Sequence, residues 1–380
     1  MHRSKSCKII VMSHPANRMP LIDALKALAA LLVLLTHFAS YGPLAAMAHE
    51  AFPGAVGWFF DYGRMAVQVF LVIAGFLAAR ALSAQGQALA ASPLPLIWKR
   101  YLRLVVPYLA AIGLAIVAAA IADHWMNDKA IPARATVKQW LAHAFLLQGL
   151  LGFESLSAGV WYIAIDFQLF ALMAMLLWLG RIRYFAPILV LIAATASLFW
   201  FNRDASWDNW AIYFFASYGL GAAAWWASGR RQLSAWLGVI ATVVIAALVV
   251  DFRLRIALAL SVALILGFSR RTGLLEQWPN ARPLAFLGQI SYSIFLVHFP
   301  ILLLANGLYA KLEFSSPMSA IFGLFLALTA SIAAATLFYR WIESPAASQR
   351  ITAALGWLFG KGLELARKVP GLTTLFAGRA

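Results

Sequence analysis

Four ionisable side chains lie inside long apolar stretches of this sequence. Lys26 and His37 lie in "LIDALKALAALLVLLTHFAS" (21–40), Asp166 in "GVWYIAIDFQLF" (159–170) and His298 in "LGQISYSIFLVHFP" (287–300). Ionisable groups in apolar helices usually face a bundle interior or a wet cavity, because exposure to lipid is costly. An imidazole oriented by a carboxylate or a second imidazole can act as a general base. We expect His37, Asp166 and His298 either to converge on such a base or each to form a local helix–helix bond.

The first of these stretches places two functional groups on one helix face. At 100° per residue, Lys26 and His37 point within about 20° of the same direction, with a rise of roughly 16 Å between them. Asp23 precedes Lys26 by three residues, which is within reach of an ion pair. This helix therefore presents a charged pair near one end and an imidazole near the other. The alternatives are that Lys26 extends to the headgroups and that His37 only bonds a neighbouring helix.

Composition indicates a protein that crosses a membrane many times. Of 380 residues, 63% are hydrophobic and 12% are charged, whereas soluble domains have roughly half and a quarter. The only cysteine, Cys7, excludes an intrachain disulfide. The net charge of +16 suggests nucleic acid at first, but an excess of basic residues in cytoplasmic loops explains it more simply.

The fold class that we predict is an all-α polytopic membrane protein with about ten transmembrane helices. An N-in, C-in arrangement places 21 of the 30 basic residues inside and 8 outside, as the positive-inside rule requires. Residues 1–20 form a cytoplasmic tail, 21–345 the integral domain, and 346–380 a basic amphipathic tail. The outer-loop segment 140–153 is a re-entrant or surface helix, or an eleventh span. The predicted spans are 21–41, 58–79, 104–122, 160–179, 185–200, 210–227, 234–250, 254–269, 284–304 and 317–339.

Residue counting places three of the ionisable groups at similar depth. His298 lies about 21 Å from the inner end of the ninth span, and His37 stands at a similar height on the first. Asp166 lies about 9 Å inside the outer end of the fourth span. Depth alone therefore allows all three side chains to meet in the outer half of the membrane.

These stretches, together with three others in order, resemble the motifs of the acyltransferase-3 family of membrane O-acyltransferases. The resemblance runs from about Leu21 to Pro345. Each motif alone is weak, but six in series are specific. The three further motifs are "GRMAVQVFLVIAGFL" (Gly63–Leu77), "WKRYLRLVVPYL" (Trp98–Leu109) and "YRWIESP" (Tyr339–Pro345).

The resemblance implies an integral protein of the bacterial inner membrane that transfers an acyl group, usually acetyl, from cytoplasmic acyl-CoA. The acceptor would be a hydroxyl of an envelope polysaccharide or lipid at the outer face. His37 matches the family's first-helix histidine, and Lys26 stands where the family has arginine. Gln68 replaces an aspartate, Ala74 a serine and Asp166 a glutamate. Lysine keeps the positive charge at position 26 but lacks the planar fork of arginine.

Chemistry assigns roles to both ends of the first helix. An alcohol is a poor nucleophile near neutral pH, so O-acylation needs a base, which His37 can supply. The phosphates of acyl-CoA need positive charge on the inner side, which Lys99, Arg100, Arg103 and Lys26 can supply. For any one of these basic residues, topology alone is an equally good explanation. We predict no permanently bound cofactor and no metal site.

Two other classes of function fit some of these features. A transporter or flippase of a lipid-linked glycan would also carry charges inside its spans, but it would move its substrate without covalent change. A non-catalytic membrane scaffold would tolerate the loss of His37. The order of the motifs favours the acyltransferase.

Overall fold

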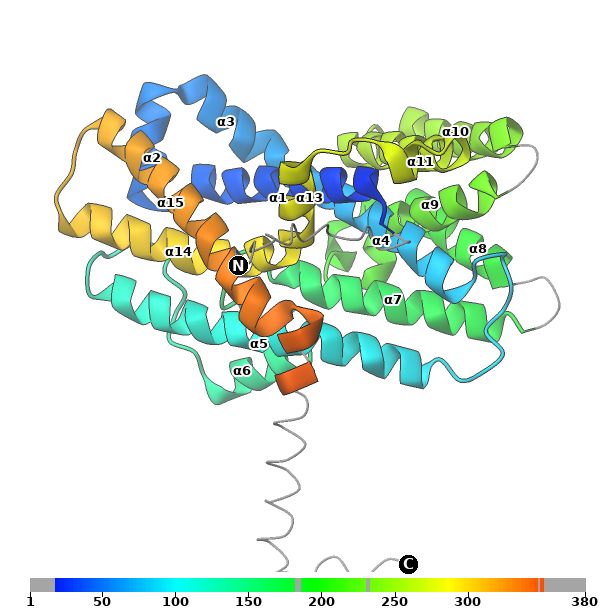
Figure 1. Ribbon diagram of the computed structural model, residues 1–380, viewed down its shortest axis with the longest axis horizontal. Coiled ribbons are helices and arrows are strands. Elements are labelled where there is room, and N and C mark those ends of the chain that lie inside the picture. The colour runs from blue at the N-terminus through cyan, green and yellow to red at the C-terminus, as the bar shows by residue number, and fades with distance from the viewer. Residues whose placement is uncertain (1–17, 182–185, 230–232, 348, 352–380) are drawn as a thin grey trace, which may run out of the picture.

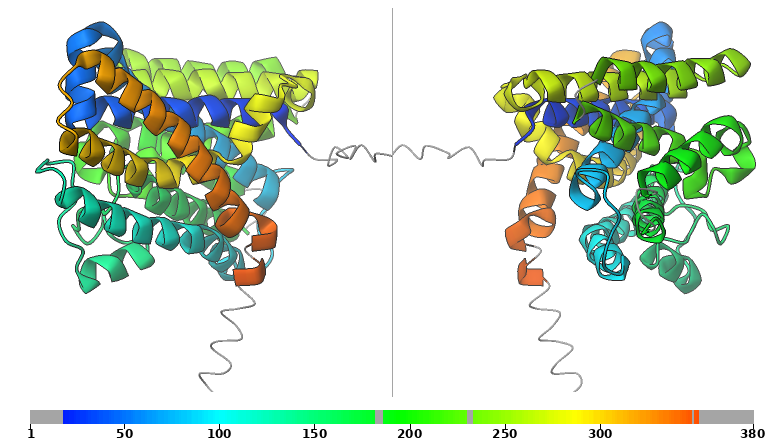
Figure 2. Two further views of the ribbon diagram at one scale, coloured as in Figure 1. Left: turned by 60° about the vertical axis from the view of Figure 1, so that its left-hand side comes forward. Right: turned by 90° about the vertical axis from the view of Figure 1, so that its right-hand side faces the viewer.

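The computed structural model describes residues 18–181, 186–229, 233–347 and 349–351, and this part of the chain is helical and contains no strand. Figure 1 shows α1, α5, α7 and α14 side by side along the long axis, with α15 crossing them obliquely. The left view in Figure 2 shows the same oblique crossing. The helices are α1 (Pro20–Ser40), α2 (Gly42–Ala51), α3 (Pro53–Tyr62), α4 (Val67–Leu82), α5 (Leu94–Asp123), α6 (Val137–Ala144), α7 (Trp161–Leu179), α8 (Ala186–Phe199), α9 (Ala211–Ser228), α10 (Leu233–Val250), α11 (Leu254–Thr272), α12 (Leu274–Gln277), α13 (Arg282–Gln289), α14 (Ser291–Lys311) and α15 (Pro317–Phe338).

In the part of the chain that the structure describes, seven helical segments are long and apolar enough to cross a membrane. A bilayer core of about 30 Å needs roughly 20 apolar residues in a helix. Each of the ten predicted spans lies on helical structure, while the count of ten and the N-in, C-in orientation stay predictions. The seven segments are Pro20–Ser40, Pro53–Leu82, Leu94–Asp123, Trp161–Leu179, Ala186–Arg203, Ser291–Lys311 and Pro317–Glu343.

The predicted ninth span, 284–304, has the wrong boundaries. The helix is broken at Ile290, between α13 and α14, and α14 continues to Lys311. The Ser291 hydroxyl donates to the Gly288 carbonyl at 2.9 Å, a local bond that competes with helix continuation. Gly288 also lies directly against the backbone of Asp23, where a Cβ would overlap the Asp23 carbonyl. The break therefore lets α13 pack on the beginning of α1.

The second predicted span is also interrupted. A 3-10 turn at Gly63–Ala66 separates α3 from α4. At Gly63 a Cβ would overlap the Thr36 hydroxyl of α1, so the turn lies against the C-terminal half of that helix. Close backbone approach recurs between α4 and α9, where a Cβ on Gly75 would overlap the Tyr218 carbonyl. Small residues allow membrane helices to approach closely.

The predicted helix at 140–153 is shorter than expected. It covers Val137–Ala144 and begins with a capping box between Thr136 and Gln139. Its eight residues are about 12 Å long, which is too short to cross the membrane, so an eleventh span here is excluded. The predicted tails lie almost wholly outside the described residues.

Candidate active site

Two histidines from distant parts of the sequence meet at the centre of the candidate site. The distance from His37 Nδ1 on α1 to His298 Nε2 on α14 is 2.6 Å. His298 is fully buried, and His37 keeps partial exposure. The predicted meeting of these two imidazoles is therefore present in the structure.

The hydrogen bonds around His298 fix the protonation of both rings. His298 Nδ1 lies 3.0 Å from the Ile294 carbonyl, which can only accept, so Nδ1 carries the proton. In a neutral imidazole the other nitrogen, Nε2, is then an acceptor. His37 Nδ1 must therefore be the donor to His298, and a neutral His37 has its lone pair on Nε2. The pair leaves one unprotonated nitrogen, Nε2 of His37, which is what a general base requires.

The beginning of α7 forms a wall beside His37. Gly159 has φ +80°, and a Cβ at this position would lie 3.1 Å from His37 Cε1. A side chain is therefore disfavoured there for both strain and space. The other walls are aromatic: the Tyr41 ring centre lies 5.7 Å from that of His37, and Phe295 packs against Tyr162. These rings surround the imidazole of His37, which keeps partial exposure.

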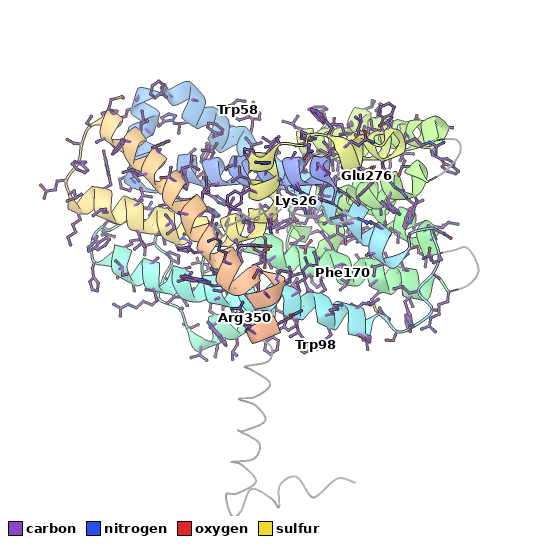
Figure 3. All side chains as sticks on the ribbon, in the orientation of Figure 1. Lys26, Trp58, Trp98, Phe170, Glu276 and Arg350 are labelled. Atoms are coloured by element: carbon purple, nitrogen blue, oxygen red, sulfur yellow. The ribbon has the colours of Figure 1, made fainter. Side chains whose placement is uncertain are left out.

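Asp166 pairs with arginine rather than with a histidine. Its carboxylate accepts from Arg100 at 2.5 Å, with the Asp166 side chain 7% exposed and that of Arg100 27% exposed. The Arg100 guanidinium also lies 5.4 Å from the ring centre of Phe170, which Figure 3 labels on α7. Only the two histidines therefore meet, whereas Asp166 is paired with a counter-ion from α5. The depth estimate did not predict this partner, because the predicted third span began at residue 104 whereas α5 begins at Leu94.

Basic side chains gather near the other end of α1. Lys26, labelled in Figure 3, interacts electrostatically with Asp23, Arg103, Arg100 and Glu343. Three of the predicted donor-binding residues, Lys26, Arg100 and Arg103, are therefore close enough to influence one another's charge. Lys99 is exposed on the surface of α5.

Sequence analysis assigned no role to Glu343, although it quoted the motif that contains it. The Glu343 carboxylate accepts a hydrogen bond from the Ser293 hydroxyl on α14, and it interacts with Lys26 and Arg103. It therefore supplies negative charge to the basic group. The sequence does indicate a partner for Glu343, because a carboxylate next to an apolar span is costly when it is unpaired.

A second buried histidine, His143, binds the loop that leads to Gly159. His143 Nδ1 lies 2.8 Å from the Gln139 carbonyl, and the Leu156 N–H donates to His143 Nε2 at 3.2 Å. His143 lies outside the membrane-spanning helices, and burial lowers its pKa, against a smaller opposite effect of the bond to Gln139. Its Nε2 accepts from Leu156 and so is unprotonated, and the imidazole ties α6 to the loop at Leu156. In the described part of the chain, no group of three His, Cys, Asp or Glu side chains is placed to hold a metal ion.

Gln68 and Ser217 form a neutral polar pair between α4 and α9. The Ser217 hydroxyl donates to Gln68 Oε1 at 2.6 Å, and both residues are buried. Gln68 therefore satisfies this contact without placing a charge in the bundle.

Comparison with known proteins gives a family match. The acyltransferase-3 model, described as "Acyltransferase domain", matches residues 20–339. This interval contains Lys26, His37, Arg100, Asp166 and His298. No curated protein and no solved structure matches the chain.

Proposed function

The chain belongs to the acyltransferase-3 family, and from this we propose that it is a membrane O-acyltransferase with His37 as general base. The donor is acyl-CoA, with acetyl as the acyl group, which reaches the protein from the cytoplasm. The acceptor is a hydroxyl of an envelope polysaccharide or lipid at the outer face of the bacterial inner membrane. The observation that carries the proposal is the tautomer of His37, whose unprotonated Nε2 faces away from His298.

Proton transfer at His37 accounts for both halves of the reaction. The acceptor oxygen attacks the thioester carbonyl carbon while His37 Nε2 takes the hydroxyl proton, so that a C–O bond forms. The tetrahedral intermediate then collapses, the C–S bond breaks, and the proton on His37 passes to the departing thiolate. The Nδ1–H of His37 keeps its bond to His298 throughout, which fixes the orientation of the imidazole. His298 is thus a positioning residue in this mechanism.

The basic group near Lys26 is suited to the other end of the donor. Coenzyme A carries phosphates that cannot enter the apolar core, so they must stay at the inner surface, where Arg103 is exposed. Arg100, three residues earlier on α5, is less exposed than Arg103, and its buried Nε has no hydrogen-bond partner among the described residues. That N–H is therefore available to an acceptor atom of the pantetheine arm. Lys26 lies between these residues and His37, which fits a thioester lying along α1.

The test is incorporation of label into the acceptor. Membranes that contain the wild type or His37→Ala at equal abundance receive [14C]acetyl-CoA from the cytoplasmic side, and label in extracted lipids and glycans is counted. The matched control is His49→Ala, because His49 is a histidine exposed on α2. We expect His37→Ala to abolish incorporation and His49→Ala to leave it unchanged. Equal incorporation by all three proteins would reject the base.

The same assay separates the alternatives. A transporter predicts translocation of a glycan with no protein-dependent label in any product, and a scaffold predicts that His37→Ala behaves as wild type. Lys26 gives a second comparison, since Lys26→Arg restores the family's residue. We expect Lys26→Arg to remain active and Lys26→Ala to raise the donor KM.

A further inference from the structure

A buried asparagine on α14 binds the segment that follows His37. Asn306 is fully buried and lies eight residues after His298. Its Nδ2 donates to the Tyr41 carbonyl at 3.2 Å and to the Leu302 carbonyl at 3.0 Å. Its Oδ1 accepts from the Leu44 N–H at 2.9 Å. Both amide hydrogens and one acceptor site are therefore used, and two of the three bonds hold the corner between α1 and α2.

This corner determines where the outer turn of α1 lies. α1 ends at Ser40, three residues after His37, and Tyr41 leaves the helix with an extended backbone while its N–H bonds the His37 carbonyl. The last carbonyls of a helix have no intrahelical partner, so an unrestrained last turn frays. Asn306 binds the Tyr41 carbonyl and so restrains the chain directly after the turn that carries His37.

The side chain of Tyr41 extends this restraint to the imidazole. Its ring centre lies 5.7 Å from that of His37 and 5.4 Å from that of Phe299. α14 therefore holds α1 at two levels, through His298 and through Asn306. The two levels are about 12 Å apart along α14.

The first of the two residues between the bonded backbone groups of Tyr41 and Leu44 lies directly against the Asn306 amide. Gly42 has φ +81°, and a Cβ there would lie 2.5 Å from Asn306 Oδ1 and 2.7 Å from Nδ2. Such contacts would displace the amide. Glycine at position 42 thus allows the corner to close directly over the Asn306 side chain.

We propose that Asn306 is a positioning residue for acyl transfer. It holds the outer turn of α1 at the register in which the Nδ1–H of His37 meets His298 Nε2. The inference rests on the proposed function, because it assigns Asn306 a role in the reaction for which His37 is the base. It concerns the chemical step alone, since the donor-binding group lies about 16 Å away along α1.

The first test is Asn306→Ala, with Asn202→Ala as the matched control. Asn202 is also buried, and it donates to the Tyr213 carbonyl at 2.8 Å and accepts from Arg253 at 2.9 Å, but it contacts neither histidine. We expect Asn306→Ala to lower kcat about 10- to 100-fold, to leave the donor KM unchanged and to alter the pH profile of kcat. Asn202→Ala should leave kcat per folded molecule and its pH profile unchanged.

A second variant perturbs the same contact without changing Asn306. Gly42→Ala should push the amide out of place and lower kcat to a similar extent, with the donor KM again unchanged. The double variant should be no less active than the worse single variant, because both act on one contact. Where Asn306→Ala is not recovered from membranes, Gly42→Ala decides the question.

The outcomes separate this inference from the proposed function. Wild-type kcat in folded Asn306→Ala or Gly42→Ala, with His37→Ala inactive, would overturn the role of Asn306 alone. Equal losses in Asn306→Ala and Asn202→Ala would also overturn it, since the effect would then be general destabilisation. Full transfer by His37→Ala would reject the base itself.

Discussion

Asp166→Asn tests whether the fourth-span carboxylate is a counter-ion or part of the base. The substitution removes the negative charge but keeps the shape of the side chain. It leaves the guanidinium of Arg100 inside the bundle without its 2.5 Å partner. The ion-pair interpretation therefore predicts a loss of stability that depends on the charge of Arg100.

The size of this loss follows from the burial of the pair. Removing one partner of a buried ion pair costs about 3–5 kcal/mol, because the remaining charge is uncompensated. Since the Arg100 side chain is still 27% exposed, the lower end applies, at about 3 kcal/mol. In Asp166→Asn/Arg100→Gln both charges are absent, so the double variant should regain about 1.5–3 kcal/mol relative to the sum of the single losses.

The assay is the free energy of unfolding in mixed micelles, measured for the two single variants and the double variant. Asp61→Asn, an exposed aspartate on α3, is the matched control and should unfold as the wild type does. Additive losses would refute the ion pair. A wild-type free energy in Asp166→Asn, combined with abolished acyl transfer, would instead place Asp166 in the catalytic group.

Three other predictions concern the donor site, the topology and the outer loop. Arg103→Ala should weaken coenzyme A binding by about 1.5–3 kcal/mol, measured by titration of the folded protein, and unchanged affinity would leave Arg103 a purely topological role. Single cysteines at Lys129 and Arg270 should react with impermeant reagents from opposite sides of the membrane, and labelling from one side would reject the N-in, C-in arrangement. Burial lowers the pKa of His143 from the ordinary value of 6.5, so below that pH the unfolded chain binds a proton that the folded chain does not. Stability should therefore fall as pH decreases through 6.5, measured as the unfolding midpoint against pH, and His143→Gln should remove this pH dependence.

Sequence patterns predicted the helices and a similar depth for His37 and His298, while leaving open whether the two histidines meet. Apolar length located every predicted span on helical structure, and residue counting placed His37 and His298 at one depth. The similar depth of the two histidines did not depend on accurate helix boundaries. α14 begins at Ser291, not at Leu284, yet the two imidazoles meet, because their positions are set by packing of α1 against α14.

The ion-pair partner of Asp166 could not be predicted from apolar length and residue counting. The predicted third span began at residue 104, whereas α5 begins at Leu94. Arg100 therefore lies about 9 Å inside the helix, where its long side chain reaches Asp166. Apolar periodicity does not detect this extension, because basic residues at a membrane surface and in a helix interior look alike in sequence. The corner at Asn306 likewise depends on tertiary contact, and only Gly42 marks it in the sequence.

The central claim is that His37 presents an unprotonated Nε2 because its Nδ1–H is bonded to His298. The most direct measurement is the 15N NMR signals of both His37 ring nitrogens in the full-length protein at neutral pH, assigned by comparison with His37→Gln. We predict a protonated Nδ1 and a bare Nε2, with loss of this preference in His298→Ala. A protonated Nε2 and a bare Nδ1 in the wild type would contradict the account.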